Sequence, residues 1–393
     1  MGLGAAGRVC VSGLGALAMV DLIRVWEEKV GLVSRLECEL GEREAEEARR
    51  DSHAHRLPRP CGLTVHTGIG CRFGCLYCYI YDMGFPNMPR PYPLRGIQLA
   101  YAIALNPAVA PGCYGTFMAF GSVTEPFMDE TAERALEYLD AVARILGNPI
   151  QISTKAWISD RLAARIGSIP DRLSILVTIV TTSLHRVLEP GAPGPEERFQ
   201  SIRTLSRHGV HTCLFLRPIL PGLSDREVED ILVRALDSGA AGVVLGSMRV
   251  TGGIIKRLEA VGYPYMREIL GRIPGDLRPG VQVTLRMSDL KRRFARLARE
   301  LGLRVYPSAC AASVDAHGLG CAACQLGPCG DVNKLPDVDE NSLREVSARY
   351  GLSLEKVMID EQRILLTVRG SEAKIAQFRE FVKSVCKRRV IVR

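Results

Sequence analysis

Short apolar segments alternate with helical segments over residues 63–245, and this alternation constrains the fold more than any other feature of the sequence. The apolar segments are rich in β-branched residues and have the length of strands: Leu63–Thr67, Thr116–Phe120, Ile150–Thr154, Leu173–Ile179, His211–Leu216 and Ala241–Leu245. Helical patterns separate most of them: Glu130–Leu146, Ser159–Ile166, Pro195–His208 and Asp225–Ser238. Such an order predicts parallel strands joined by right-handed crossovers. We therefore expect an α/β fold of about six strands, either an open doubly wound sheet or a partial barrel, with ligands at the carboxyl ends of the strands.

Changes in this alternation of strand and helix patterns divide the chain into four parts. Residues 1–60 predict an N-terminal helical extension, residues 61–250 the α/β core, residues 251–335 a helical extension with its own cysteines, and residues 336–393 a small α/β domain. The third part predicts two helices and a strand: Tyr265–Arg272, Ser288–Leu301 and Arg304–Tyr306. The last part predicts helix, strand, strand, helix and strand: Ser342–Tyr350, Val357–Ile359, Ile364–Arg369, Ser371–Val385 and Val390–Val392. In the core, Ser224 followed by Glu227 predicts a capping box at the start of a helix.

Thirteen cysteines in a chain of 393 residues direct attention to metal binding. No apolar run approaches the roughly 18–20 residues that span a bilayer. Val11–Val20 is apolar but short, and it is interpreted as the start of an amphipathic helix rather than a signal peptide. We therefore expect a cytoplasmic location, no membrane partner, and cysteines that are metal ligands or thiols more often than disulfides. The scattered cysteines are expected to be small buried apolar residues: Cys10, Cys38, Cys61, Cys113, Cys213 and Cys386.

Basic residues near the C-terminus contribute to a net charge of +8. Lys387, Arg388 and Arg389 permit contact with a polyanion such as nucleic acid, while distributed surface charge or a domain that only pads the core is an equally acceptable interpretation. His53 and His55 precede two prolines and are expected to lie on an exposed linker rather than to bind a metal.

The first cysteine group directly follows the first predicted strand. Cys71, Cys75 and Cys78 lie in one short loop between Gly70 and Tyr79, at spacings of four and three residues. Three thiolates can each bind one iron of a cubane cluster and leave the fourth iron without a protein ligand. A structural zinc site is the alternative, but such sites usually have four protein ligands and no fourth cysteine lies adjacent.

These residues carry a resemblance to a known family. The spacing of Cys71, Cys75 and Cys78, with an aromatic residue before the last, resembles the signature of the radical S-adenosylmethionine (radical SAM) superfamily. Residues 61–248 also resemble its spore photoproduct lyase-like branch through four segments: Gly121-Ser122-Val123-Thr124-Glu125-Pro126, Ile152-Ser153-Thr154-Lys155, Leu188-Glu189-Pro190-Gly191-Ala192-Pro193 and Phe215-Leu216-Arg217-Pro218-Ile219-Leu220-Pro221-Gly222. The last hundred or so residues do not share the resemblance.

The resemblance implies a fold and a chemistry. The fold is a partial (β/α)6 barrel with a 4Fe-4S cluster at the end of its first strand. The cofactor is S-adenosylmethionine, which the reduced cluster cleaves to a 5′-deoxyadenosyl radical that abstracts hydrogen from a substrate. Such an enzyme takes its electron from a donor of the ferredoxin or flavodoxin type.

Further site residues follow from the resemblance. Tyr77 can pack against the bound cofactor. Gly121, Ser122 and Glu125 occupy the place that binds the amino group of the cofactor, and Lys155 is expected to meet its carboxylate or a hydroxyl. Ser183 and Arg217 follow the fourth and fifth strands and are predicted to face the cofactor.

A cysteine returns hydrogen to the product radical in spore photoproduct lyases, and Cys113 is a candidate for this role. Its surroundings do not match the donor site of that family. An ordinary structural cysteine is the alternative interpretation.

The second cysteine group is Cys310, Cys321, Cys324 and Cys329. Four thiolates would saturate a metal, so the group predicts an auxiliary 4Fe-4S cluster or a structural zinc, and we favour the cluster because the neighbouring chemistry moves electrons. A group that binds no metal is the third interpretation. This group departs from spore photoproduct lyase and puts DNA lesion repair in doubt. The substrate classes left open are a DNA lesion or RNA nucleoside and a peptide or protein. A non-catalytic iron–sulfur module that binds nucleic acid is a third hypothesis.

Overall fold

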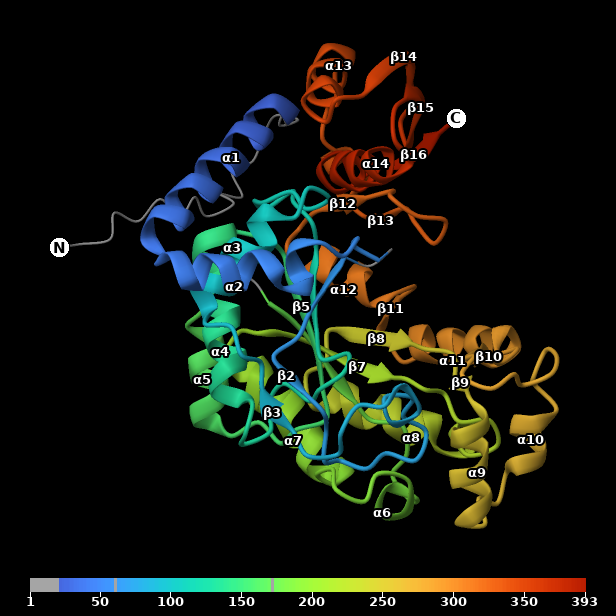
Figure 1. Ribbon diagram of the computed structural model, residues 1–393. Coiled ribbons are helices and arrows are strands. Elements are labelled where there is room, and N and C mark those ends of the chain that lie inside the picture. Colours follow the sequence, from blue (N-terminus) through green and yellow to red (C-terminus); the bar gives the residue numbers. More distant parts are fainter. Residues whose placement is uncertain (1–20, 60–61, 171–172) are drawn as a thin grey trace.

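The fold is described from a computed structural model that covers residues 21–59, 62–170 and 173–393 (Figure 1). The apolar segment Val11–Val20 and the cysteines Cys10 and Cys61 lie outside these residues. Two helices begin the described chain, α1 (Leu22–Glu39) and α2 (Glu42–Arg50). Asp21 caps α1 because its carboxylate accepts hydrogen bonds from the backbone N–H groups of Ile23 and Arg24.

A seven-stranded parallel sheet forms the centre of the molecule. Its strands are β1 (Leu63–Val65), β4 (Met118–Phe120), β5 (Ile150–Thr154), β6 (Ser174–Thr178), β7 (His211–Leu216), β8 (Gly242–Leu245) and β11 (Arg304–Tyr306). The spatial order follows the sequence order without a reversal. A doubly wound sheet reverses its order at a switch point, so the observed order is that of a partial barrel.

The seventh strand lies outside the predicted core. β11 pairs with β8 in parallel, with Arg304 opposite Gly242. The predicted boundary at residue 250 is therefore one strand too early, because a long insertion separates β8 from β11 in the sequence and the sheet continues after it. The insertion contains β9 (Arg249–Val250), α9 (Gly252–Ala260), α10 (Met266–Leu270), β10 (Val283–Thr284) and α11 (Ser288–Glu300).

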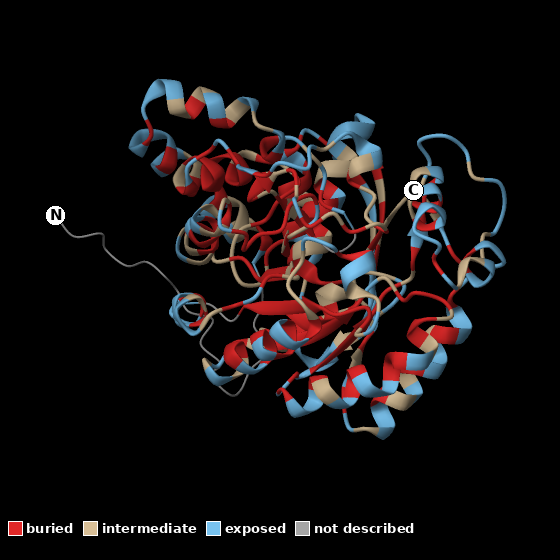
Figure 2. Ribbon diagram, turned by 90° about the horizontal axis from the view of Figure 1, so that it is seen from below, coloured by how far each residue is buried: buried red, intermediate tan, exposed pale blue. Residues whose placement is uncertain are grey.

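Helices cover the outer face of the sheet (Figure 1). They are α3 (Gly96–Leu105), α4 (Ala132–Ala141), α5 (Asp160–Gly167), α7 (Pro195–Arg207), α8 (Ser224–Asp237) and α11. Alternate strand residues such as Ile175 and Val177 pack outward with Ile202 of α7 in the main hydrophobic core. Figure 2 shows buried residues concentrated along the strands and on the facing sides of these helices. Three short elements complete this part: β2 (Gly68–Ile69), β3 (Arg90–Pro91) and α6 (His185–Leu188).

A helix that the sequence did not predict fills the inner face of the sheet. α12 (Ala309–Ala316) contacts β5, β6, β8 and β11. Its Ala311 and Ala312 pack against the inward-facing Leu176, Phe215 and Val244. The small side chains of Ala311 and Ala312 allow the helix to approach the strands closely.

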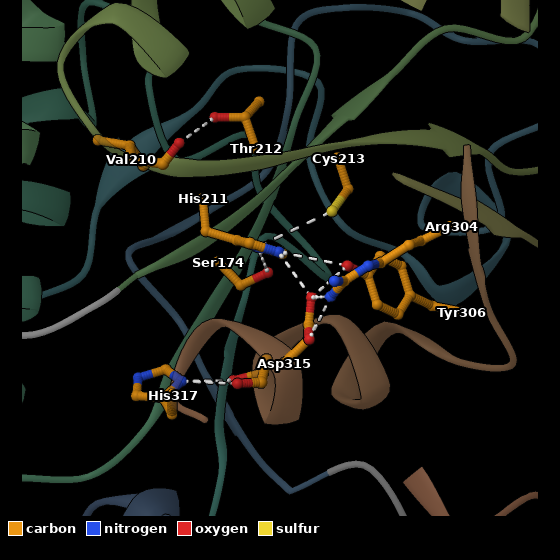
Figure 3. A network of polar contacts seen from close by, with 10 residues as sticks. Ser174, Val210, His211, Thr212, Cys213, Arg304, Tyr306, Asp315 and His317 are labelled. Carbon is orange, nitrogen blue, oxygen red and sulfur yellow. Dashed lines mark hydrogen bonds and ion pairs between the residues drawn. The ribbon is translucent and has the colours of Figure 1, made fainter. Parts of the chain in front are cut away.

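Polar contacts fix the C-terminal end of α12 (Figure 3). Asp315 accepts hydrogen bonds from Arg304 at 2.7 Å and from the hydroxyl of Tyr306 at 2.6 Å, both on β11. His211 at the start of β7 lies 3.6 Å from the same carboxylate. These contacts set the position of α12 and of Cys310 at its other end.

The C-terminal unit has its own hydrophobic core. A hairpin of β12 (Gly320–Cys321) and β13 (Cys329–Gly330) precedes α13 (Glu340–Arg349), β14 (Ser353–Ile359), β15 (Arg363–Arg369), α14 (Glu372–Cys386) and β16 (Arg389–Val392). β14 pairs with β15 in antiparallel fashion and β16 pairs with β15 in parallel. α1 joins this core through Leu22 and through Trp26, whose ring lies 4.9 Å from that of Tyr350.

Two local predictions are wrong because tertiary contacts override the local pattern. His53 is buried rather than exposed, and its ring bonds the Asp51 carboxylate. Ser224 does not cap α8, because its hydroxyl accepts from the N–H of Leu220 while Glu227 bonds another segment. Of the two interpretations of the basic C-terminal residues, packing on the core fits Lys387 and Arg388, which are 1% and 8% exposed.

The described scattered cysteines differ in environment. Cys213 and Cys386 are buried as predicted, whereas Cys38 is exposed. Among the described helices, none is both long enough and apolar enough to cross a bilayer.

Candidate active site and metal-binding cysteines

The loop that carries Cys71, Cys75 and Cys78 leaves the carboxyl end of β1 and folds tightly on itself. Gly70 and Gly74 have φ values of 88° and 65°, which side chains with a Cβ rarely adopt. A Cβ on Gly70 would also lie 2.5 Å from the carbonyl oxygen of Pro86. Glycine is therefore required for the loop to turn where it does.

The segment after α6 supports the cysteine loop through backbone hydrogen bonds. The N–H of Leu76 donates to the Leu188 carbonyl at 2.9 Å, and the N–H of Gly191 donates to the Phe73 carbonyl at 3.0 Å. On the other side, Arg257 of α9 donates to the carbonyl of Cys78 at 2.9 Å and pairs with Asp82. The loop is thus fixed from two directions.

A buried charged network lies beneath the loop. Glu189 and Arg198 have fully buried side chains and form an ion pair at 2.7 Å. Tyr77 belongs to the loop, and its hydroxyl donates a hydrogen bond to the Glu189 carboxylate. This bond connects the loop to the buried ion pair. The structure gives the Tyr77 hydroxyl this protein partner, and the predicted contact of its ring with a cofactor remains a prediction.

Lys155 extends from the end of β5 toward the cysteine loop. Its ammonium lies 5.6 Å from the centroid of the Tyr77 ring. Burial alone would lower the pKa of Lys155, but the neighbouring Cys75 and Glu189 raise it overall. Lys155 is therefore a cation beside the predicted cluster ligands, as a group that binds an anionic partner must be.

Burial affects the thiols themselves. It raises the pKa of Cys71 to about 11 and raises the pKa of Cys75 and Cys78 as well. Metal ligands must be thiolates, so metal binding at this loop would release protons and replace them with cationic charge.

Glu125 lies at the end of the second barrel strand and is buried. Its carboxylate accepts from the hydroxyl of Thr154 at 2.5 Å and from the N–H of Lys155 at 2.8 Å. Burial is the largest influence on Glu125 and raises its pKa above the usual value. Glu125 and Lys155, two of the residues predicted to bind the cofactor, are thus in direct contact.

Gly121 and Ser122 form the turn between β4 and Glu125. Gly121 has a φ of 87°, and a Cβ there would lie 2.2 Å from the carbonyl of Ser153. The carbonyl of Ser122 accepts a hydrogen bond from the hydroxyl of Tyr79, next to Cys78. The turn is therefore joined to the cysteine loop.

Ser183 and Arg217 follow their strands at the same edge of the sheet but have other surroundings. The hydroxyl and N–H of Ser183 donate to Glu227 of α8, which gives Ser183 a structural partner. Arg217 is exposed, and its guanidinium lies 5.8 Å from the centroid of the Phe215 ring. Their predicted roles in cofactor binding remain predictions.

The structure contradicts the prediction that Cys113 donates a hydrogen atom. Cys113 is disulfide-bonded, so its sulfur carries no hydrogen. It also precedes β4, in a turn where Gly112 bonds the Leu146 carbonyl, whereas the cysteine loop follows the carboxyl end of β1. The two lie at opposite edges of a parallel sheet.

The second cysteine group surrounds one small pocket. Cys310 of α12 and Cys321, Cys324 and Cys329 of the hairpin region line it. Cys321 and Cys329 are directly opposite each other on β12 and β13. Gly62 and Phe117, which precede β1 and β4, line it from the barrel, and Lys383 and Lys387 line it from the C-terminal unit. The group therefore lies at the amino ends of β1 and β4, opposite the first group.

Across residues 21–59, 62–170 and 173–393, no three His, Cys, Asp or Glu side chains converge closely enough to hold a single metal ion. The ligand sets of both cysteine groups therefore remain predictions.

Three residues at this site had no role in the sequence analysis: Glu189, Arg198 and Arg257. Glu189 lies within a segment that carried the family resemblance, and this was the one signal available for it. Arg198 and Arg257 reach the loop from α7 and α9, and nothing in their local sequence indicates this contact.

Comparisons with known proteins agree with this geometry. Residues 65–235 match the family model of the Radical SAM superfamily. The chain is 24% identical over 212 residues to an uncharacterized protein of Mycobacterium tuberculosis, a match that covers 49% of this chain and 60% of that protein. It is 26% identical over 242 residues to a radical SAM Nalpha-GlyT isomerase of Pseudomonas phage M6, covering 59% of this chain and 47% of that protein. The chain thus spans about half the length of these relatives.

The fold is shared with solved structures of spore photoproduct lyase. A variant with bound AdoMet and dinucleoside spore photoproduct superposes with a TM-score of 0.53 at 15% identity, over 65% of this chain and 79% of that chain. A second variant, with dinucleoside spore photoproduct, has a TM-score of 0.52 at 15% identity and covers 68% of this chain and 85% of the other. At this identity the likeness shows the fold alone.

Proposed function

Because residues 65–235 match the family model of the Radical SAM superfamily, we propose that this chain is a radical SAM enzyme that holds a 4Fe-4S cluster on Cys71, Cys75 and Cys78. With its cluster reduced, such an enzyme cleaves S-adenosylmethionine to a 5′-deoxyadenosyl radical, which abstracts hydrogen from a substrate. One observation carries the proposal. Three thiols on a glycine-constrained loop lie at the carboxyl edge of the barrel beside the buried cation Lys155 and the buried carboxylate Glu125.

The protein residues have separable tasks in this proposal. The three thiolates hold the metal and leave one coordination position for the cofactor. Lys155 would attract the carboxylate of the cofactor, and the turn from Gly121 to Glu125 would hold its amino group. The buried pair of Glu189 and Arg198 would keep the loop in place through the hydrogen bond of Tyr77 to Glu189.

The metal content and its spectrum test this proposal. Anaerobically reconstituted protein should contain iron and sulfide and, once reduced, give the electron paramagnetic resonance signal of a 4Fe-4S cluster that changes on addition of S-adenosylmethionine. Cys75→Ala should abolish this change, while Cys213→Ala, which removes a buried thiol outside the loop, should leave it intact. If the electron paramagnetic resonance signal of the wild-type protein does not change when S-adenosylmethionine is added, the proposal is contradicted.

We further propose that the four-cysteine pocket binds a second 4Fe-4S cluster, with zinc as the alternative. The four thiols line one pocket, and two of them lie opposite each other on a hairpin. Iron, zinc and sulfide analysis of wild type against a variant with Cys310, Cys321, Cys324 and Cys329 all replaced by serine separates the two. A loss of iron and sulfide supports the cluster, and a loss of zinc supports the alternative.

For the substrate, we propose a nucleic acid, either a lesion in DNA or a nucleoside in RNA. Arg217 follows β7 and Arg249 begins β9, and both oppose the increase that burial causes in the pKa of the Tyr79 phenol, next to Cys78. Both are exposed. Exposed cations on this side of the barrel favour a polyanion over a neutral peptide.

The arginines provide a direct test of this substrate class. Binding of a single-stranded oligonucleotide should weaken steeply with salt, and Arg249→Ala should reduce both the affinity and the salt dependence. Arg43→Ala is the control, because this arginine is exposed on α2. Equal effects of the two substitutions would favour a peptide or protein substrate, the remaining alternative.

A further inference from the structure

Lys387 is a buried lysine in the wall of the four-cysteine pocket. It is 1% exposed and ends helix α14. Its backbone has a φ of 51°, and among the described residues it is the one non-glycine residue with a positive φ. A side chain with a Cβ adopts this conformation unfavourably, so the fold accepts backbone strain to place Lys387 here.

The contacts of Lys387 join the C-terminal unit to the barrel. Its ammonium donates to the carbonyl of Gly115 at 2.6 Å and lies 4.1 Å from the centroid of the Phe117 ring. Its own carbonyl accepts a hydrogen bond at 2.7 Å from the N–H of Ala322, next to Cys321. Lys387 and the four cysteines therefore line the same pocket from different parts of the chain.

No carboxylate of the described residues forms an ion pair with Lys387. Glu380, an acidic residue of the pocket wall, already pairs with Lys383 and Arg379. A carbonyl dipole and an aromatic face compensate a buried ammonium only in part, because neither carries a full negative charge. The position therefore lacks an anion that a stable fold would be expected to supply.

The four cysteines can supply that anion. Four thiolates around a divalent metal, or around a 4Fe-4S core of charge 2+, leave a net charge of about −2 in the pocket. A buried dianion is itself unfavourable without a nearby cation. Each of the two charges thus compensates the burial of the other.

We infer that Lys387 is a positioning residue that balances the charge of a metal–thiolate centre in the four-cysteine pocket, so that the C-terminal unit completes this centre. The inference rests on the second metal centre proposed above. On this inference Lys387, at the end of α14, compensates the charge of the metal centre. The C-terminal unit then contributes directly to metal binding.

Lys387→Met in the full chain tests the inference, because methionine preserves most of the volume and removes the charge. Lys383→Met is the matched control, since it removes a lysine of the same pocket wall whose charge is already paired with Glu380. Competition with a chelator should show the affinity of the second centre reduced at least about tenfold in Lys387→Met and within about twofold in Lys383→Met.

Thermal unfolding separates this role from simple packing. In the metal-loaded protein Lys387→Met should lower the melting temperature, whereas in the chelator-treated protein it should leave the temperature unchanged or raise it, because an uncompensated charge has been removed. An equal decrease in both forms, with unchanged metal affinity, would overturn the inference and leave Lys387 a packing residue. If wild type and the four-serine variant contain the same metal, the second centre itself is absent and the inference fails with it.

Discussion

Buried charges beneath the cysteine loop connect its position to the rest of the barrel. The Glu189 carboxylate accepts a hydrogen bond from the Tyr77 hydroxyl and pairs with the Arg198 guanidinium, and the Lys155 ammonium lies over the Tyr77 ring. These groups are far apart in sequence, so the folded barrel alone brings them together. The thiols can hold a metal only if this support keeps the loop in a fixed conformation.

Glu189→Gln should destabilise the protein strongly. The substitution leaves Arg198 buried without its anion, and breaking a buried ion pair by removal of one partner typically costs about 3–5 kcal/mol. Urea unfolding measures the loss. Glu133→Gln is the control, because the pair of Glu133 with Arg165 is exposed and should contribute little. Similar losses in the two variants would show that the buried pair is unimportant.

Stability should also decrease as the pH falls from about 6.5 toward 3. Burial, followed by the charge of Arg56, lowers the pKa of His66 to about 3, so the folded chain keeps this ring neutral where the unfolded chain binds a proton. The difference amounts to about 2 kcal/mol at pH 5. His66→Gln should flatten the dependence of unfolding free energy on pH, while His55→Gln, at an exposed histidine, should not. An unchanged slope in His66→Gln would contradict this account.

At the scale of elements, the alternation of strands and helices was sufficient to predict most of the sheet, whereas the metal site that the thiol spacing predicts stays a prediction. The alternation left two topologies open, and the strand order decided between them because it has no reversal. β11 was predicted as a strand but placed outside the core, since nothing in the intervening sequence indicates a return to the sheet.

α12 could not be predicted from the sequence for a physical reason. A helix on the outer face has one apolar stripe, and that periodicity is the signal that sequence analysis detects. α12 is enclosed by the strands of the barrel, and its buried Ala311, Ala312 and Val314 leave no such contrast. The polar contact of Asp315 with Arg304 and Tyr306 likewise appears only in three dimensions.

Asp315→Asn tests whether this contact holds α12 in place. Asparagine keeps the shape of the side chain but removes the negative charge that accepts hydrogen bonds from Arg304 and Tyr306. This loss should lower the free energy of unfolding by about 1–3 kcal/mol. Asp160→Asn is the control, because the contact of Asp160 with His208 is mostly exposed. If Asp315→Asn unfolds at the wild-type urea concentration, the contact does not stabilise α12.

At the scale of the whole molecule, the two cysteine groups lie at opposite ends of β1. The first group follows β1 at the carboxyl edge, and the second group meets Gly62, just before β1, at the amino edge. The C-terminal unit closes the amino edge through α14, and α1 packs on that unit rather than on the site (Figure 1). The carboxyl edge carries the proposed cofactor site, as expected for parallel barrels.

The central claim is that three thiolates leave one coordination position at which S-adenosylmethionine is cleaved. The direct test is formation of 5′-deoxyadenosine from S-adenosylmethionine by anaerobically reconstituted, reduced protein, measured by chromatography. We predict several turnovers of 5′-deoxyadenosine in wild type and none in a variant with Cys71, Cys75 and Cys78 replaced by alanine. If wild type binds its cluster and S-adenosylmethionine yet forms no more 5′-deoxyadenosine than this variant, the account is contradicted.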